Sequence, residues 1–165
     1  MSTALQAQQP FDHLPSLAAI DQAAEEIRSH YPATAAIHWP LLSEAIGTQI
    51  IVKHENHTCL AAFKGRGGLT YMRRLLARLP DCPGVISATR GNHGQSLAYA
   101  AAQFGLRTVI LVPHGNSAEK NAAMKALGAE LIEFGDDYQS AREEADRLSE
   151  SQGLEFVPPF HVDLL

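Results

Sequence analysis

Lys64 occupies an unusual place in the stretch AFKGRGG, where it follows Phe63 and precedes three glycines within four residues. A lysine amine becomes a nucleophile at neutral pH when burial or neighbouring positive charge lowers its pKa. A single lysine at the end of a strand, however, is usually an exposed surface residue. Lys64 alone therefore predicts no activity, and a second feature has to support it.

A second chemical stretch, SATRGNHGQS, follows an apolar run and precedes an expected helix over 94–104. Gly91 and Gly94 let the backbone come close to a bound group, and the amides at the start of the helix attract an anion such as a carboxylate. Asn92 can donate and accept hydrogen bonds, and His93 can hydrogen-bond or titrate. Glycine-rich turns of this kind also occur for structural reasons alone, so both interpretations stay open at this point.

The segments around these stretches alternate between short apolar runs and amphipathic runs. We expect strands at 84–88, 107–112, 129–134 and 155–160, and helices at 69–79, 94–104, 117–127 and 138–151. This alternation predicts an α/β fold, an open twisted parallel sheet with helices on both faces in a three-layer αβα arrangement. Ligands of such sheets bind beyond the carboxyl ends of the strands, which is where both chemical stretches fall.

The earlier part of the chain is expected to be helical over 15–30 and 40–47, with a buried strand over 49–55. Residues 1–14 are expected to be a flexible lead. Ser117 and Asp136 or Asp137 are candidate helix caps, and Gly128 is a candidate helix stop. The apolar residues at helical spacing in the third helix predict a core stripe of Met72, Leu75, Leu76 and Leu79.

Composition excludes several classes of function. The net charge of −5 over 165 residues gives no basic surface for a nucleic acid, and no apolar run approaches the roughly 18 residues of a membrane helix. Cys59 and Cys82 form no C-x-x-C pair, which favours a reduced, cytoplasmic protein. His54 and His57 lack a third ligand nearby in the sequence, so we expect no metal site.

Taken together, AFKGRGG and SATRGNHGQSLAYAA resemble the pyridoxal-phosphate enzymes of the tryptophan-synthase-β type, fold type II. Within them the likeness is to threonine/serine dehydratases and serine racemases. It runs from about residue 15 to the end of the chain. It includes LLSEAIGTQIIVKHEN before the lysine and VILVPHGNSAEKNAAMKALGAELI after the second loop.

The resemblance implies a role for each matching residue. Lys64 forms the Schiff base with pyridoxal phosphate and later moves the α-proton, Phe63 lies against the cofactor, and Asn92 hydrogen-bonds its phenolic oxygen. The loop that holds the substrate carboxylate contains Thr89, Gly91, Asn92 and His93, with Arg90 between them. The implied activity is an ammonia-lyase that converts L-threonine or L-serine to a 2-oxo acid and ammonia. The relatives suggest a homodimer.

Two positions depart from the family pattern. Arg90 replaces the serine or alanine of SSGNH or SAGNH, and because a guanidinium cannot relay a proton, racemase activity is disfavoured. Arg90 could instead pair with the second carboxylate of a β-hydroxy dicarboxylic substrate, or with a surface carboxylate. In LAAFK, Leu60 and Ala61 stand where relatives carry threonine and glycine.

The resemblance also implies a division of the chain. Residues 1–52 would belong to a larger cofactor domain, 53–157 would form a small α/β domain with the lysine loop, and 158–165 would be a truncated connection to a missing C-terminal half. In the family the cofactor's phosphate loop lies in that half. The sequence therefore predicts an α/β fold that is incomplete relative to the family. The alternative hypothesis for the function of the chain is a non-catalytic truncated module.

Overall fold

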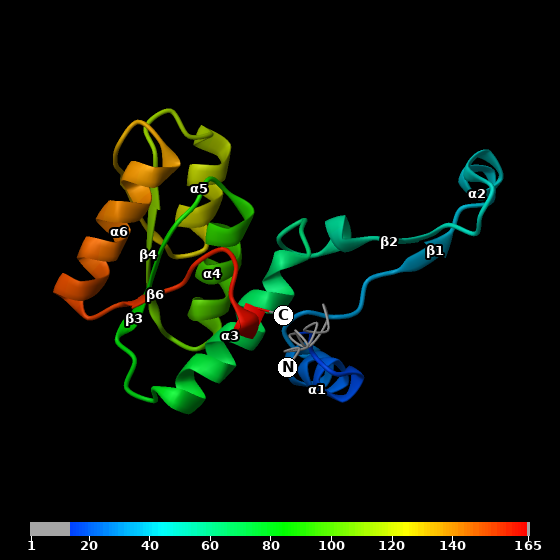
Figure 1. Ribbon diagram of the computed structural model, residues 1–165, viewed down its shortest axis with the longest axis horizontal. Helices are drawn as coiled ribbons and strands as arrows, with labels where there is room; N and C mark the ends of the chain where they lie inside the picture. Colours follow the sequence, from blue (N-terminus) through cyan, green and yellow to red (C-terminus); the bar gives the residue numbers. More distant parts are fainter. Residues whose placement is uncertain (1–13, 165) are drawn as a thin grey trace, which may run out of the picture.

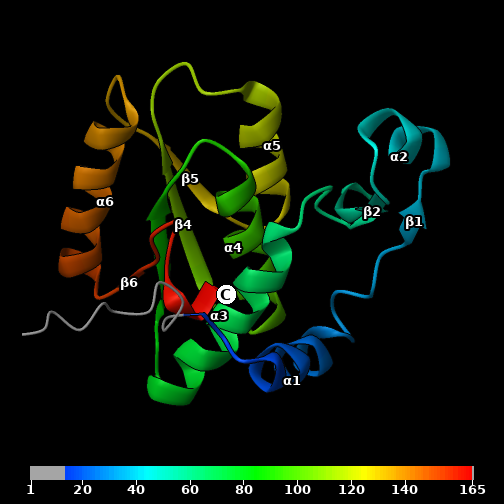
Figure 2. The same ribbon diagram turned by 45° about the vertical axis from the view of Figure 1, so that its right-hand side comes forward.

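The computed structural model describes residues 14–164, so the expectation for residues 1–13 falls outside the described residues. An α/β body contains every element from α3 onward, while α1 (Leu17–Ile27) lies beside it and a thin arm projects from it (Figures 1 and 2). The arm, residues 36–53, consists of β1 (Ala36–His38), α2 (Pro40–Ile46) and β2 (Ile51–Lys53).

The body is built on a four-stranded parallel sheet in the order β5-β4-β3-β6. Its strands are β3 (Gly84–Ala88), β4 (Arg107–Val112), β5 (Glu130–Glu133) and β6 (Glu155–Phe156). Every residue of β3 is buried, and so is β4 apart from Arg107. Strands buried on both faces require near-continuous apolar runs, which is the pattern of GVISA and RTVILV.

Helices cover both faces of this sheet. On one face lie α3 (Lys64–Arg78), α4 (Asn92–Gln103) and α5 (Ala118–Ala126), and on the other lies α6 (Tyr138–Gln152) (Figure 1). Alternate strand residues point to opposite faces, so Val85 packs in the core under α3 and α4 while Ile86 packs in the core under α6. The predicted three-layer fold class is confirmed.

The helix ends follow local chemistry that the sequence indicates. The Ser117 hydroxyl accepts from the Lys120 N–H at the start of α5, and the Asp137 carboxylate accepts from the Ser140 N–H at 2.8 Å. Gly47 and Gly128 adopt positive φ angles of 76° and 95° just after α2 and α5. Both predicted caps and the predicted stop at Gly128 are confirmed, and Gly47 ends α2 in the same way.

The prediction that the strand at 49–55 is buried is wrong. β2 forms only at Ile51–Lys53, pairs antiparallel with β1, and leaves Ile51 60% exposed. The sequence pattern did not predict β1. In the described structure the arm keeps a set of large apolar side chains in solvent: Ile37, Trp39, Leu41, Leu42, Ile46 and Ile51.

The start predicted for the third helix is also wrong, because α3 begins at Lys64 and not at Leu69. Gly65, Gly67 and Gly68 therefore lie inside the helix, where glycine is normally unfavourable. A Cβ on each would overlap a neighbour, respectively the Tyr31 ring, the Leu164 carbonyl and Ser96. These glycines are close-packing residues. In the core stripe, Met72 and Leu75 are fully buried, but Leu79, just beyond the end of the helix, is exposed.

Candidate active site

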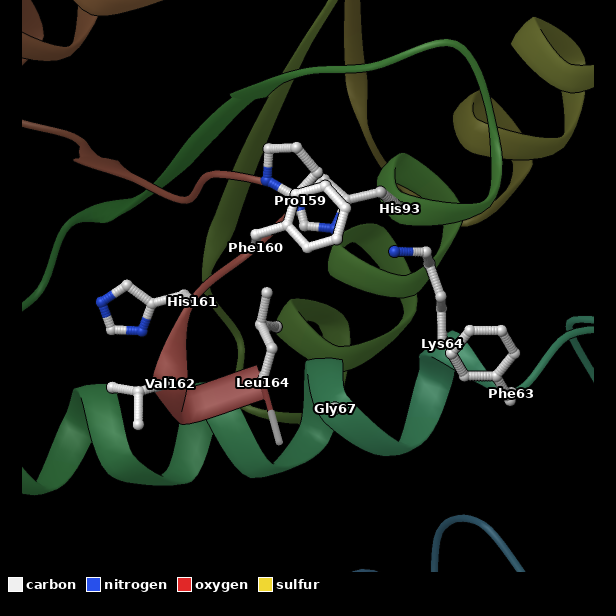
Figure 3. Close-up of a pocket in the computed structure, with 9 residues that line it drawn as sticks. All are labelled: Phe63, Lys64, Gly67, His93, Pro159, Phe160, His161, Val162 and Leu164. Atoms are coloured by element: carbon white, nitrogen blue, oxygen red, sulfur yellow. The ribbon is translucent and has the colours of Figure 1, made fainter. Parts of the chain in front are cut away.

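Lys64 is the first residue of α3, and its side chain reaches into a pocket of about 510 Å³ (Figure 3). His93, in the first turn of α4, lies across the pocket from it. The other wall is the segment that follows β6. The lining residues are Phe63, Lys64, Gly67, His93, Pro159, Phe160, His161, Val162 and Leu164.

Aromatic rings flank the Lys64 amine. Its Nζ lies 6.0 Å from the ring centre of Phe63 and 5.8 Å from that of Phe160. Both phenylalanines are largely exposed, so their rings border open pocket volume and are not part of the core. The result is an amine at the edge of a small cavity with flat apolar surfaces beside it.

His93 is buried and electrically neutral at neutral pH. Burial is the main cause that lowers its pKa to about 4, and the nearby Lys64 charge lowers it further. A hydrogen bond between Nε2 and the Val157 carbonyl, at 3.2 Å, opposes that shift. With Nε2 donating to this carbonyl, Nδ1 is left as an acceptor. His93 therefore offers the pocket a hydrogen-bonding group and not a positive charge.

This histidine should make stability depend on pH. Because the pKa of His93 is lower in the folded state than its ordinary value of 6.5, the unfolded chain binds the proton first as pH falls. The free energy of unfolding therefore has its full value above about pH 6.5 and falls as the pH drops toward 4. The loss is roughly 2 kcal/mol at pH 5. We expect thermal melts of His93→Asn between pH 7 and pH 5 to lack this decline. If the melting temperatures of the wild type and His93→Asn fell equally between pH 7 and pH 5, His93 would not be the cause of the decline.

The remaining residues of the predicted carboxylate loop lie beside His93 but do not line the pocket. Thr89 is buried and its hydroxyl accepts from the Gly91 N–H at 3.2 Å, while Arg90 and Asn92 are exposed at the start of α4. The structure thus brings Lys64, Phe63 and His93 together. The carboxylate-binding roles of Thr89, Arg90, Gly91 and Asn92 stay predictions.

The charge of exposed Arg90 acts on Asp137, the residue that caps α6. The pKa of Asp137 is held below its usual value, first by its hydrogen bonds with Ser140 and, as a smaller contribution, by the Arg90 charge. Of the two interpretations of Arg90, this neighbour favours a partner on the protein surface.

Gly94 has a packing reason that the sequence alone does not reveal. A Cβ on Gly94 would lie 2.7 Å from Thr89 Cγ2 and overlap Met124 Sδ, whereas one on Gly91 would meet only the flexible end of Lys120. Ala61, where the family resemblance places a glycine, adopts the left-handed conformation with φ 49°. That conformation costs a non-glycine residue roughly 1–2 kcal/mol.

Sequence reasoning missed the segment that closes the pocket, residues 159–164. Asp163 pairs with Arg78 at 2.6 Å and lies 3.7 Å from Arg74, and the His161 ring stands edge-on to Tyr71 at 5.3 Å. All three partners lie on α3. Acidic and aromatic residues after the last strand were the available signal, but nothing in their spacing indicates which helix they contact.

Comparison with known proteins settles the family. A family model described as pyridoxal-phosphate dependent enzyme matches residues 27–164. The chain belongs to this family. The family's dependence on pyridoxal phosphate makes that molecule the expected cofactor, and the fold is that of fold type II. The curated relatives include a putative threonine dehydratase of Sinorhizobium fredii, 34% identical over 88% of this chain and 43% of the relative.

Other members of the pyridoxal-phosphate family extend the likeness. The L-threonine ammonia-lyase of Geobacter sulfurreducens is 34% identical over 88% of this chain and 36% of its own length. Among solved structures, a pyridoxal 5'-phosphate-dependent aspartate racemase has a TM-score of 0.82 at 29% identity, and a threonine deaminase from T.th. has 0.76 at 30%. Each comparison covers 88% of this chain and 46% of the solved chain. The chain thus spans less than half the length of these relatives.

The pocket fits the carbonyl end of such a cofactor. It has a lysine amine, flat aromatic side chains on either side, and a volume within the usual range for small-molecule sites. Within residues 14–164, the space beside the glycines that follow Lys64 is filled by neighbours and leaves no cradle for a phosphate group. In the same range, no cluster of His, Cys, Asp and Glu side chains suits a metal ion, and no helix is long and apolar enough to cross a membrane.

Proposed function

We propose that this chain carries the cofactor lysine of a pyridoxal-phosphate-dependent ammonia-lyase that converts L-threonine or L-serine to a 2-oxo acid and ammonia. The observation that carries the proposal is the Lys64 amine, which reaches into a pocket between Phe63, Phe160 and His93. Relatives named threonine dehydratase and L-threonine ammonia-lyase support the reaction class.

In this proposal each residue takes the task that the family resemblance implies. Lys64 would hold the cofactor through Nζ at its aldehyde carbon and would later hold the substrate's α-proton. Phe63 would lie against the cofactor ring, and Asn92 would donate to its phenolic oxygen. When bound, the cofactor supplies the electron sink for the α-carbon. The amides at the start of α4, with Thr89, Gly91 and neutral His93, hold the substrate carboxylate.

We further propose that residues 1–52 belong to a larger cofactor domain, that 53–157 form the small α/β domain with the lysine loop, and that 158–165 form a connection to the C-terminal half of the family fold. Two-stranded sheets are marginally stable by themselves, and the arm exposes Trp39, Leu41 and Ile51. An exposed apolar surface of this kind marks an interface. Full activity would then require the part of the family fold that the chain's match does not cover.

A second candidate substrate is a β-hydroxy dicarboxylic amino acid. The position of the Arg90 guanidinium within the proposed carboxylate loop favours it, and a relative named aspartate racemase handles a dicarboxylic amino acid. The Asp137 neighbour counts against it. A non-catalytic module is the candidate of another class, and the exposed arm is the observation that favours it.

The cofactor role of Lys64 can be tested by titrating the chain with pyridoxal phosphate. Attachment of the cofactor to a lysine produces a visible absorbance, which we expect to saturate for the wild-type chain and to be lost in Lys64→Ala. Lys125→Ala, at the end of α5 and away from the pocket, is the matched control and should keep it. Absorbance that persists unchanged in Lys64→Ala would remove Lys64 from the assigned role.

A further inference from the structure

Tyr31 lies far from Lys64 in the sequence but is buried against the turn that presents it. Its side chain is 2% exposed, and its hydroxyl donates to the Ala62 carbonyl at 2.5 Å. Ala62 precedes the first residue of α3 by two positions. The residue preceding α3, Phe63, supplies no side-chain cap, so the orientation of the helix start depends on contacts from elsewhere in the chain.

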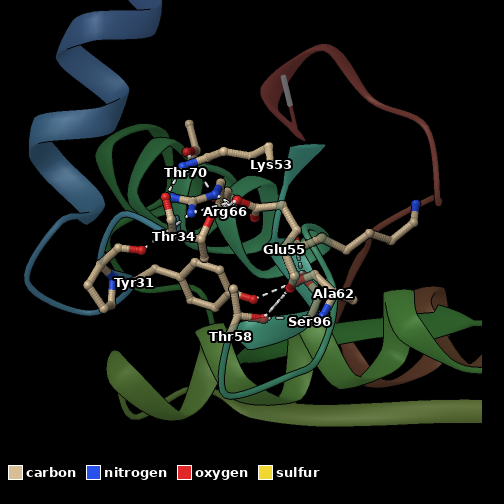
Figure 4. Close-up of polar contacts among 11 residues, drawn as sticks. Tyr31, Thr34, Lys53, Glu55, Thr58, Ala62, Arg66, Thr70 and Ser96 are labelled. Atoms are coloured by element: carbon tan, nitrogen blue, oxygen red, sulfur yellow. Dashed lines mark hydrogen bonds and ion pairs between the residues drawn. The ribbon is translucent and has the colours of Figure 1, made fainter. Parts of the chain in front are cut away.

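Side chains from three separate segments provide these contacts (Figure 4). Thr58 accepts from the Ala62 N–H and lies 3.1 Å from the Ala62 carbonyl, where it shares the acceptor with Tyr31. Ser96 of α4 donates to the Lys64 carbonyl at 2.6 Å. The backbone on both sides of Phe63 is therefore held by hydroxyl groups.

The ring of Tyr31 fixes the first turn of α3 in a second way. A Cβ at Gly65 would lie 2.5 Å from Tyr31 Cε2, so the ring occupies the space beside the residue that follows Lys64. The Arg66 guanidinium also lies 5.1 Å from the ring centre and pairs with Glu55 at 2.9 and 3.0 Å. The ring therefore packs against both Gly65 and this ion pair.

The Tyr31 hydroxyl keeps its proton over the working range of the protein. Burial raises the pKa of Tyr31 above its ordinary value of 10.0, and the nearby charge of Glu55 acts in the same direction. Thr58 and Arg66 oppose the shift. The hydroxyl therefore remains a donor to Ala62 at neutral pH.

We propose that Tyr31 is a positioning residue for Lys64: its hydroxyl and ring fix the turn at residues 62–65 so that the Lys64 amine points into the pocket. The inference rests on the proposed role of Lys64 as the cofactor lysine. It adds a residue from the connection between α1 and β1 to a site otherwise formed by α3, α4 and the segment after β6. Tyr31 touches neither the pocket nor the reacting atoms, so it acts through Lys64.

Tyr99 provides a matched control. Its hydroxyl also donates to a backbone carbonyl, that of His30 at 2.7 Å, and its ring stands edge-on to Tyr31 at 6.1 Å. The variants Tyr31→Phe and Tyr99→Phe each remove one tyrosine-to-carbonyl hydrogen bond and keep the ring. Each should lower stability by a similar amount, whereas only Tyr31→Phe frees the turn beside Lys64.

The experiment measures how fast pyridoxal phosphate attaches to Lys64 in the 165-residue chain. Samples are reduced with borohydride at successive times, and mass spectrometry of the peptides gives the rate at Lys64 relative to that at exposed Lys125. A lysine displaced from its productive direction loses reactivity steeply, so we expect the ratio to fall roughly tenfold in Tyr31→Phe and to change less than about twofold in Tyr99→Phe. Thr58→Val, which removes the other hydroxyl from Ala62, should act in the same direction as Tyr31→Phe and provides the test if that variant does not fold.

Equal ratios in the wild type, Tyr31→Phe and Thr58→Val, with Lys64 still preferred, would overturn the positioning role and leave the proposed function intact. A similar fall in Tyr99→Phe would also overturn it, since the effect would then reflect general loosening. A wild-type chain without preference for Lys64 would overturn the proposed function, and the inference with it.

Discussion

Joining residues 1–164 to the second half of the Sinorhizobium fredii relative is expected to raise 2-oxobutanoate formation from L-threonine at least about a hundredfold over the 165-residue chain. The chain has an amine, aromatic walls and a neutral histidine at its pocket, but the glycines that follow Lys64 leave no phosphate cradle. A loosely held cofactor reacts slowly because small displacements of reacting groups cost large factors in rate.

The arm gives a structural reason to expect that the two halves assemble. Leu41 is 82% exposed, and Trp39 and Ile51 are exposed beside it. Burial of such side chains contributes roughly 1.5–3 kcal/mol each. Attachment of a partner domain should therefore stabilise the arm as well as complete the site.

Two controls make this experiment decisive. The joined protein with Lys64→Ala should lose the activity, and the joined protein with Trp39→Asp should lose it through failed assembly. Substantial 2-oxobutanoate production by the 165-residue chain alone would contradict the account, because its site would then be sufficient. Activity that is unchanged by Lys64→Ala would contradict the role of the lysine.

Gly68→Ala is expected to destabilise the protein by roughly 2–3 kcal/mol, because an added methyl would overlap the Ser96 hydroxyl and lie 2.9 Å from the Ser96 carbonyl oxygen. The backbone of α4 cannot yield as easily as a side-chain end. Ser96 also bonds the Lys64 carbonyl, so the substitution pushes apart the two helices that carry Lys64 and His93. The midpoint of thermal unfolding should fall by roughly 5–10 °C.

Helix propensity alone predicts the opposite sign, since alanine is favoured over glycine by about 1 kcal/mol inside a helix. Ala77→Gly, at an exposed position of the same helix, measures that intrinsic preference in the same protein. A rise in the unfolding midpoint of Gly68→Ala would show that α3 and α4 are not packed as closely as described.

The elements that the sequence predicts well are those whose signal is local. β3 and β4 are expected at 84–88 and 107–112 and form there, because their apolar, β-branched runs suit strands buried on both faces. The predicted start of α3 lies five residues too late because glycines near Lys64 look like a loop. Their reason is tertiary, since Tyr31, Leu164 and Ser96 come from distant parts of the chain.

The candidate site also contains residues with a local sequence signal and residues that only tertiary contacts bring together. Two short motifs identify Lys64, Phe63 and His93, and the structure places all three on one pocket. Tyr31 and the segment 159–164 could not be predicted as neighbours of Lys64, because only the fold brings them there. The strand at 49–55 is expected to be buried but is exposed, because an apolar run forms a buried strand only where another part of the structure covers it.

The most direct test of the account is to identify which lysine of the wild-type chain takes up pyridoxal phosphate. The chain contains Lys53, Lys64, Lys120 and Lys125, so reduction with borohydride followed by peptide mapping can assign the product to one of them. We predict that Lys64 carries most of the label at one equivalent of cofactor. Labelling spread evenly over the four lysines, or concentrated on one other than Lys64, would contradict the account.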